Sequence, residues 1–414
     1  MLRRVPRDRI RLGMYIQAIE GPWLDHPFWR SRFLLSDPAD LAALLGSSIP
    51  AVTIDDAKGL GLGDAPVAAP QAPPGQPPPA APRKPARPPP PSCTAAEELD
   101  RAARIVGRSR KAVARLFEEA RLGKAVDVAT VLPVVDEISA SVARNASTLI
   151  SITRLKTKDE YTYMHSVAVC ALMINLARQL DLPPDYVKQA GTAGLFMDIG
   201  KGFLPAELLG KRTEFTEADW AEMRRHPQLG ADAVKASGDM SKIVADVCLH
   251  HHEKYDGTGY PDGLKGDQIS LFARMAALCD TYDAIVSARP HRPARGPADA
   301  VAELYKLKGH FDETLLTSFI RSIGIYPVGS LVRLESRMLG CVAAQRRDQL
   351  TRPLVRIFYS IPQRTHVPVE EVDLAQVPEP DRIVAREEPG RWGLPDWDSY
   401  ALTILQGQKA KRAA

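Results

Sequence analysis

The sequence predicts a multidomain protein in which an all-α domain lies between a small, mainly β N-terminal domain and a small β-rich C-terminal tail. Three observations favour this fold class. Residues 65–92 hold 13 of the 35 prolines and no acidic residue, and proline lacks an amide donor, so this segment is predicted to be an extended linker. Apolar residues then recur at helical spacing to about residue 322. Short alternating apolar runs lie before the linker and after residue 326.

The composition is that of a globular protein with enough apolar material for a core. Of 414 residues, 45% are hydrophobic and 25% are charged, which excludes a wholly disordered chain. The net charge of +4 is too small to indicate a general attraction to DNA or to anionic membranes. The apolar runs are shorter than the ~20 residues of a membrane span, and the N-terminus lacks the pattern of a secretion signal. Since the five cysteines are scattered, we expect reduced thiols and a cytoplasmic location.

Residues 1–64 are predicted to form a small domain of strands and one helix. The strands are expected at residues 13–16, 32–35 and 52–54, and the helix at residues 38–45. Trp23, Phe28 and Trp29 are interpreted as core residues, because so small a domain needs large apolar side chains. A docking surface is the alternative for these three. The proline-rich linker also has an alternative, a ligand for an aromatic groove.

The helical part follows the linker and gives way to a β tail. Its lead-in is predicted to hold two amphipathic helices, at residues 94–125 and 130–156. Thr216 and Asp219 have the spacing of a capping box, which predicts the start of a helix that runs toward Pro227. The expected boundaries are 1–64 for the N-terminal domain, 65–92 for the linker, 93–156 for the lead-in, 157–322 for the main helical domain and 323–414 for the tail.

Histidines and carboxylates gather in the helical region. Seven of the nine histidines fall between residues 165 and 310. Neutral imidazole and ionised carboxylate together suit divalent metals, and one carboxylate can bridge two ions. Asp198 and Asp280 each end an apolar run, where burial without a cation would be costly. The joint pattern predicts a polynuclear metal site, although each of these residues taken singly fits a structural role better.

A glycine-rich loop directly follows the histidines at positions 250–252. The string reads His251-His252-Glu253-Lys-Tyr-Asp256-Gly-Thr-Gly259-Tyr260-Pro261, and glycine lets backbone amides approach an anion closely. Here the sequence resembles the HD-GYP family, metal-dependent HD phosphohydrolases that cleave cyclic di-GMP, over about residues 155–320. The other matching strings are Tyr163-Met-His165-Ser, Asp198-Ile-Gly-Lys201, Arg225-His226-Pro227, Asp280-Thr-Tyr-Asp283-Ala and Arg289-Pro-His-Arg292-Pro.

The resemblance implies a fold, an activity and a set of site residues. The helical part would be an HD-type catalytic domain, and residues 1–64 look like a domain of unknown function that often precedes it. The implied ligands of divalent metal, manganese or iron, are His165, Asp198, His226, His251, His252 and Asp280, with Asp198 as the bridge. Lys201 would stand near the scissile phosphate and stabilise charge there. The implied substrate-binding residues are Gly259, Tyr260, Pro261, Lys265, Arg289 and Arg292, and guanidinium suits phosphate because its donors match the oxygens in pairs.

Two positions depart from the family pattern. The histidine of the name-giving His-Asp pair is Met197 here, and a thioether is a poor ligand for manganese or iron, so one metal position loses a donor. Tyr161 stands where some members have a glutamate for a third ion. A trinuclear centre is therefore not expected.

These residues leave two functions open. The first is a bacterial cyclic di-GMP phosphodiesterase with two ions, whose activity is weakened by Met197. The second is an inactive member with one ion or none, which senses cyclic di-GMP or binds a signalling partner such as a diguanylate cyclase domain. Neither DNA nor a membrane is an expected partner. A purely structural helical scaffold would not explain why histidines, carboxylates and the glycine loop occur together.

Overall fold

The computed structural model of the chain divides into two compact units, Met1–Pro89 and Pro90–Ala414, and each is described by itself. It has the predicted fold class, a helical domain with a small β region before it and β-strands after it. Trp23, Phe28, Trp29 and the linker at 65–92 lie outside the described residues. The structure describes residues 2–20, 33–36, 38–46, 49–61, 95–123, 130–154, 161–211, 213–238, 242–287, 294–346, 349–376 and 381–406.

The first unit is built on a four-stranded antiparallel sheet with the strand order β1-β4-β2-β3. Its core includes Val5, Ile16, Val52 and Ile54, all fully buried. The sequence did not predict β1, because Val5 is the one buried residue of that strand and no alternation shows. The elements are β1 (Leu2–Pro6), η1 (Arg7–Arg9), β2 (Tyr15–Glu20), β3 (Phe33–Leu34), α1 (Pro38–Gly46) and β4 (Ala51–Asp55).

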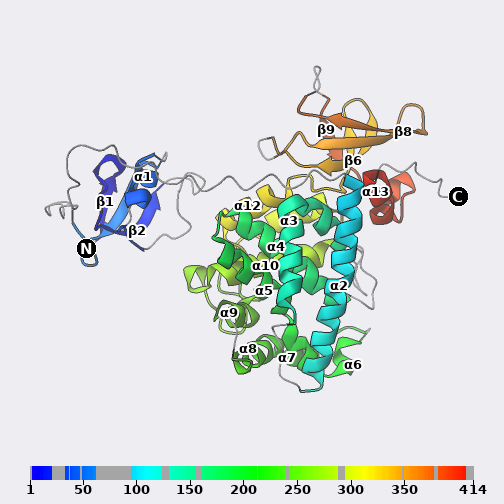
Figure 1. Cartoon of the computed structure of the whole chain (residues 1–414). Coiled ribbons are helices and arrows are strands. Elements are labelled where there is room, and N and C mark those ends of the chain that lie inside the picture. The colour runs from blue at the N-terminus through cyan, green and yellow to red at the C-terminus, as the bar shows by residue number, and fades with distance from the viewer. Residues whose placement is uncertain are drawn as a thin grey trace. The chain divides into compact units, whose positions relative to one another are not determined.

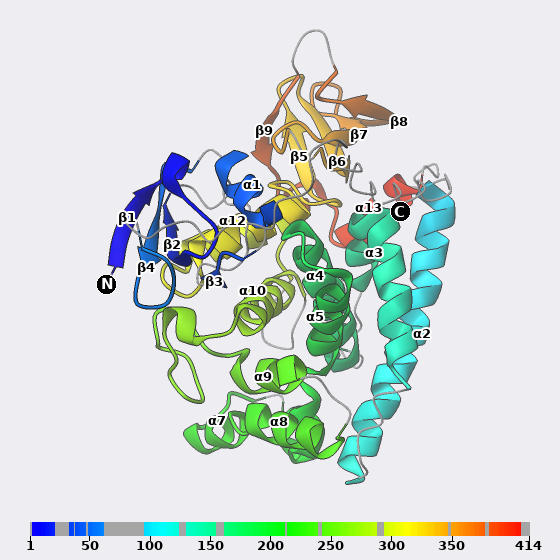
Figure 2. The same cartoon turned by 60° about the vertical axis from the view of Figure 1, so that its left-hand side comes forward.

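Two long helices, α2 (Ala95–Arg121) and α3 (Leu132–Thr153), open the second unit and run side by side in both views (Figures 1 and 2). Both pack on α4 (Tyr161–Gln179), which also contacts α5 (Pro184–Phe196) and α10 (Leu271–Val286). Every residue from 164 to 174 of α4 is buried. A helix that is apolar on all sides belongs in a core, and α4 is the centre of the helical domain.

Shorter elements complete the helical domain. Thr216 caps α7 with both hydrogen bonds of the capping box that the sequence predicted. The predicted continuation toward Pro227 is wrong, because α7 ends at Met223 and α8 begins at His226. Pro227 lies in the first turn of α8, where its missing amide hydrogen has no partner to lose. The elements are η4 (Ile199–Phe203), α6 (Ala206–Leu209), α7 (Glu217–Met223), α8 (His226–Ala236), α9 (Lys242–His250), η5 (Gly266–Gln268), α11 (Pro297–Lys306) and α12 (Glu313–Ile323).

The C-terminal part is a five-stranded antiparallel sheet with the order β8-β7-β6-β5-β9. A terminal helix, α13 (Trp397–Leu405), packs Trp397, Ala401 and Ile404 against strand residues such as Phe358. The sequence predicted only strands here, so α13 corrects that expectation. The remaining elements are β5 (Leu331–Leu334), β6 (Met338–Ala344), β7 (Leu354–Ser360), β8 (Thr365–Asp373), β9 (Ile383–Arg386) and η6 (Pro389–Trp392).

Two further expectations concern membranes and thiols. Among the helices of the described ranges, none has both the length and the apolar composition that a membrane crossing requires. Burial raises the pKa of four cysteine thiols, which pack as small apolar side chains. These free thiols are Cys170, Cys248, Cys279 and Cys341.

Candidate metal centre

The side chains predicted as metal ligands come from different helices and meet inside the helical domain. No two helices alone could supply them, so the site depends on how α4, α5, α8, α9 and α10 pack. The residues are His165 near the start of α4, Asp198 between α5 and η4, His226 at the start of α8, His251 and His252 after α9, and Asp280 in α10.

Gly200 allows η4 to approach α8 closely. A Cβ atom on Gly200 would lie 1.9 Å from the carbonyl oxygen of His226 and 2.6 Å from the backbone nitrogen of Gly230. Only glycine fits so close an approach of two backbones. Asp198 stands two residues before Gly200, and its Oδ1 atom lies 3.4 Å from Nε2 of His226. The glycine therefore brings the Asp198 carboxylate and the first histidine of α8 together.

Helix α2 covers the same turn from another side. A Cβ atom on Gly202 would lie 3.2 Å from Cβ of Ala120 and 3.3 Å from the carbonyl oxygen of Phe117. The turn that carries Asp198 is thus held between α2 and α8.

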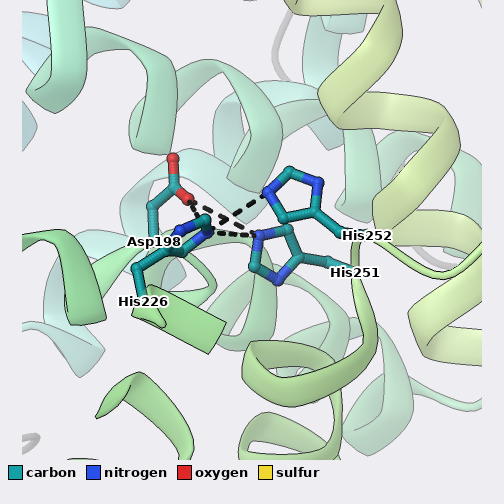
Figure 3. Close-up of side chains that lie close together, drawn as sticks. All are labelled: Asp198, His226, His251 and His252. Carbon is teal, nitrogen blue, oxygen red and sulfur yellow. Dashed lines mark hydrogen bonds and ion pairs between the residues drawn. The ribbon is translucent and has the colours of Figure 1, made fainter. Parts of the chain in front are cut away.

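Three histidines and one carboxylate converge in Figure 3, with ligand atoms that all lie within 4.8 Å of one another. Nε2 of His226 is 3.2 Å from Nε2 of His251 and 3.2 Å from Nε2 of His252. Nε2 of His251 is 3.5 Å from Oδ1 of Asp198. His252 is the most accessible of the four, with a side chain 24% exposed.

The hydrogen bonds of His226 and His251 leave their Nε2 atoms without protons. Nδ1 of His226 lies 2.7 Å from the carbonyl oxygen of Met223, and Nδ1 of His251 lies 3.0 Å from that of Cys248. A carbonyl oxygen can only accept, so each Nδ1 carries the proton and each Nε2 presents a lone pair. Oδ1 of Asp198 is buried and accepts no hydrogen bond within the described structure. Acceptors that face one another in this way repel, and a divalent cation between them removes the repulsion.

A second group forms at the other oxygen of the same carboxylate. Nε2 of His165 lies 3.0 Å from Oδ1 of Asp280 and 3.5 Å from Oδ2 of Asp198. Nζ of Lys201 lies 2.6 Å from the same Oδ2 atom. Asp198 therefore faces His226 and His251 with one oxygen, and His165 and Lys201 with the other.

The electrostatics put His226, His252 and Asp198 in the protonation states that metal binding needs. Burial, and then the Lys201 ammonium, lower the pKa of His226 to about 3. Burial and the neighbouring His251 also lower the pKa of His252. Burial by itself would raise the pKa of Asp198, but the charge of Lys201 holds it well below its usual range. At neutral pH these imidazoles are neutral and the carboxylate is ionised.

Two buried carboxylates that the sequence analysis did not assign support the site. Oδ2 of Asp283 accepts a hydrogen bond from Nδ1 of His165 at 2.7 Å. Glu253 accepts hydrogen bonds from the backbone nitrogens of Asp262 at 2.7 Å and Leu264 at 3.1 Å, and so holds the glycine-rich loop. The sequence contained a signal for each of these two carboxylates. Asp283 follows a predicted ligand by three residues, on the same face of α10, and Glu253 directly follows the histidine pair.

The glycine-rich loop forms one wall of the site. The ring of Tyr260 stacks on the ring of His252, with centroids 4.8 Å apart and 25° between the planes. Gly259 is required for this fold of the loop, because a Cβ there would lie 2.3 Å from the backbone nitrogen of Lys254. Lys265 is exposed, and no interaction among the described residues joins it to the histidines. Pro261 follows Tyr260 in the wall, whereas Arg289 and Arg292 lie outside the described residues.

Met197 occupies the position next to Asp198 and is fully buried. It is the C-cap residue directly after α5, before the turn into η4. The group of Asp198, His226, His251 and His252 assembles without a donor from position 197. The missing donor therefore does not prevent that group from forming.

Comparisons with known proteins match both parts of the chain. A family model described as a domain of unknown function (DUF3391) matches residues 2–131, and one described as HD domain matches residues 141–315. The chain is 47% identical to cyclic di-GMP phosphodiesterase PA4108 of Pseudomonas aeruginosa over 401 residues, which are 96% of this chain and 95% of the relative. It is 38% identical to cyclic di-GMP phosphodiesterase response regulator RpfG of Xanthomonas campestris over 148 residues, 35% of this chain and 39% of the relative. The solved structure of Bd1817, an HDG"Y"P protein from Bdellovibrio bacteriovorus, has a TM-score of 0.44 and 16% identity, and covers 77% of this chain and 98% of its own.

Proposed function

The chain belongs to the HD-GYP family of HD-domain proteins, and from this premise we propose that it is a metal-dependent phosphodiesterase that hydrolyses cyclic di-GMP. Relatives named cyclic di-GMP phosphodiesterases support the substrate, above all the one that matches nearly the whole chain. The donor atoms gathered around Asp198 support the reaction.

One observation carries the proposal: each oxygen of the buried Asp198 carboxylate faces a different set of donors. One ion would be held by Oδ1 of Asp198 with His226 and His251. A second would be held by Oδ2 of Asp198 with His165 and Asp280. Imidazole and carboxylate donors in this mixture suit manganese or iron.

His252 lies between the two groups and can serve either of them. Its Nε2 is 3.2 Å from Nε2 of His226, and its Nδ1 is 4.0 Å from Oδ2 of Asp280. With 24% of its side chain exposed, His252 is also more accessible to an arriving substrate than Asp280, at 18%. Its loss would therefore weaken both the ion sites and the wall that Tyr260 forms on it.

Divalent ions bound here would polarise the phosphate and lower the pKa of a water molecule that attacks it in line. The side chains of the protein would orient the substrate and neutralise its charge. Lys201 is partly exposed beside Asp198, where its ammonium group can neutralise charge that develops on the phosphate. The Tyr260 ring, fixed on His252, closes one side of the site. Lys265, Arg289 and Arg292 remain proposed substrate contacts.

The proposal is tested by hydrolysis of cyclic di-GMP by the purified full chain, loaded with manganese or with iron(II). We expect turnover together with two equivalents of metal per chain. His252→Ala and Asp198→Ala serve as controls, and each should reduce turnover by at least ~100-fold. If the wild-type chain turns over no faster than these variants while it still binds cyclic di-GMP, the chain is a sensor and the proposed activity is wrong.

A further inference from the structure

A cation outside the strings that carry the family resemblance lies at the edge of the candidate centre. Arg224 is the C-cap residue directly after α7, and its guanidinium carbon lies 5.6 Å from the centroid of the Tyr260 ring. Tyr260 in turn stacks on His252, at 4.8 Å between ring centroids. Arg224, Tyr260 and His252 thus form a connected series that leads from the surface to the metal ligands.

The charge of Arg224 is not neutralised within the described residues, where it makes no ion pair. The adjacent Arg225 differs in this respect, since its Nη1 atom lies 2.7 Å and 2.9 Å from the two carboxylate oxygens of Glu222. Both arginines are exposed. A guanidinium held against an aromatic ring keeps its N–H groups free in the plane for an anion, and it binds two phosphate oxygens at once. Arg224 is therefore an available anion-binding group and Arg225 is not.

The position of Arg224 determines which phosphate it can bind. A phosphate that is cleaved must reach the donor atoms around Asp198, and the Tyr260 ring lies between Arg224 and those atoms. A cyclic dinucleotide carries two phosphates on opposite sides of one ring. When one of them is at the metal ligands, the other points away from them.

On the proposed function, we propose that Arg224 binds the phosphate of the cyclic dinucleotide that is not being cleaved. The guanidinium then selects substrates with a second phosphate and has no part in the chemical step. Its removal should raise KM for cyclic dinucleotides and leave kcat almost unchanged.

The test compares two substrates and three variants of the full chain. Cyclic di-GMP has two phosphates, whereas bis(p-nitrophenyl) phosphate has one. Arg224→Ala should raise KM for cyclic di-GMP about 10-fold, with kcat and the hydrolysis of the small diester each within about 2-fold of wild type. Arg224→Lys, which keeps the charge but not the fork of donors, should show a smaller rise in KM. Arg225→Ala is the matched control, with the same change of charge, and should leave all these values unchanged.

Direct binding separates this inference from the proposed function. Calorimetry with cyclic di-GMP and metal-free protein should show a Kd about 10-fold weaker for Arg224→Ala than for wild type. If wild type binds the nucleotide without turnover and Arg224→Ala binds it more weakly, the role of Arg224 is supported and the proposed phosphodiesterase activity is wrong. If wild type turns over and Arg224→Ala has the same KM and Kd, the inference is wrong. An equal loss of activity of Arg224→Ala toward both substrates, together with a lower metal content, would also overturn the inference.

Discussion

The carboxylate of Asp283 fixes the orientation of the His165 ring, because its Oδ2 atom lies 2.7 Å from Nδ1 of His165. Both side chains are 2% exposed. Since an ionised carboxylate only accepts, Nδ1 of His165 donates to Asp283, and this bond directs Nε2 of the same ring toward Asp280 and Asp198. A carboxylate behind a metal-binding histidine commonly determines the tautomer of that histidine.

Asp283→Ala should therefore weaken the second metal position while the group of Asp198, His226 and His251 keeps its ion. We expect the affinity for the second equivalent of manganese to fall about 10- to 100-fold. Titration of metal-free protein with manganese, followed by metal analysis, measures this. Thr281→Ala is the control on the same helix, because within the described residues its hydroxyl bonds back to the carbonyl oxygen of Ala277. Equal manganese isotherms for Asp283→Ala and wild type would contradict the role of Asp283.

Gly200→Ala should separate η4 from α8, because the new Cβ would overlap the carbonyl oxygen of His226. The shift would cost about 1–3 kcal/mol of unfolding free energy and would move Asp198 away from the histidines. Denaturant unfolding and manganese titration check the two effects. Gly210→Ala is the matched control, since its Cβ would meet nothing closer than 3.4 Å. Identical behaviour of the two variants would show that η4 and α8 do not need this contact.

Glu253→Gln should loosen the glycine-rich loop. The carboxylate accepts two backbone N–H groups, and an amide nitrogen in place of one oxygen leaves one of those donors unsatisfied, at about 1–3 kcal/mol. Hydrogen exchange of the loop amides should accelerate, and KM for cyclic di-GMP should rise. Asp262→Asn is the control, because that side chain is 54% exposed. Unchanged exchange in Glu253→Gln would mean that other contacts hold the loop.

His250 should give the metal-free protein a stability that depends on pH. Its Nδ1 lies 2.8 Å from Asp246 and its Nε2 lies 3.1 Å from Asp262, and the bond to Asp246 is the main cause that raises the pKa of His250 above its usual value. A raised pKa stabilises the fold fully below the unfolded value of about 6.5, and the stabilisation disappears as pH rises through the folded pKa. The difference in unfolding free energy between wild type and His250→Gln should be larger at about pH 5.5 than at about pH 9. A difference that grows with pH would have the wrong sign.

Met197→His tests whether the missing donor limits the enzyme. Because Asp198 and three histidines assemble without position 197, we expect kcat for cyclic di-GMP to change by less than about 10-fold. Metal equivalents and kcat are measured on both proteins under the same loading conditions. A rise in kcat of several orders of magnitude would show that the wild-type chain is a degenerate member of its family.

The convergence of the predicted ligands could be inferred from the sequence because each one lies in a short, distinctive string. The resemblance also implied Asp198 as the shared carboxylate. Which side chains face each of its oxygens could not be inferred, since that depends on contacts between residues as far apart as His165 and Asp280. Arg224 was missed for the same reason. Nothing in its own neighbourhood distinguishes it from Arg225, and the distinction arises where α7 meets the loop that carries Tyr260. The roles of all these residues stay predictions.

In the fold, the long amphipathic helices were predictable from their period, and the short elements at the edges were not. β1 lacks an alternating pattern because only Val5 points into the core. α13 is nine residues long and is stabilised by its fit on the sheet, where Nε1 of Trp397 donates to the carbonyl oxygen of Gly329 at 2.7 Å. Such elements depend on tertiary packing more than on local propensity.

Helix α2 ends at Arg121, twenty residues before the HD-domain match begins at residue 141. A fragment trimmed to the matched region would therefore lose the wall formed by Phe117 and Ala120, and would expose the turn at Gly202 to water. A working truncation has to start ahead of Ala95. A truncation made between the two family matches would therefore remove part of the support of the candidate site.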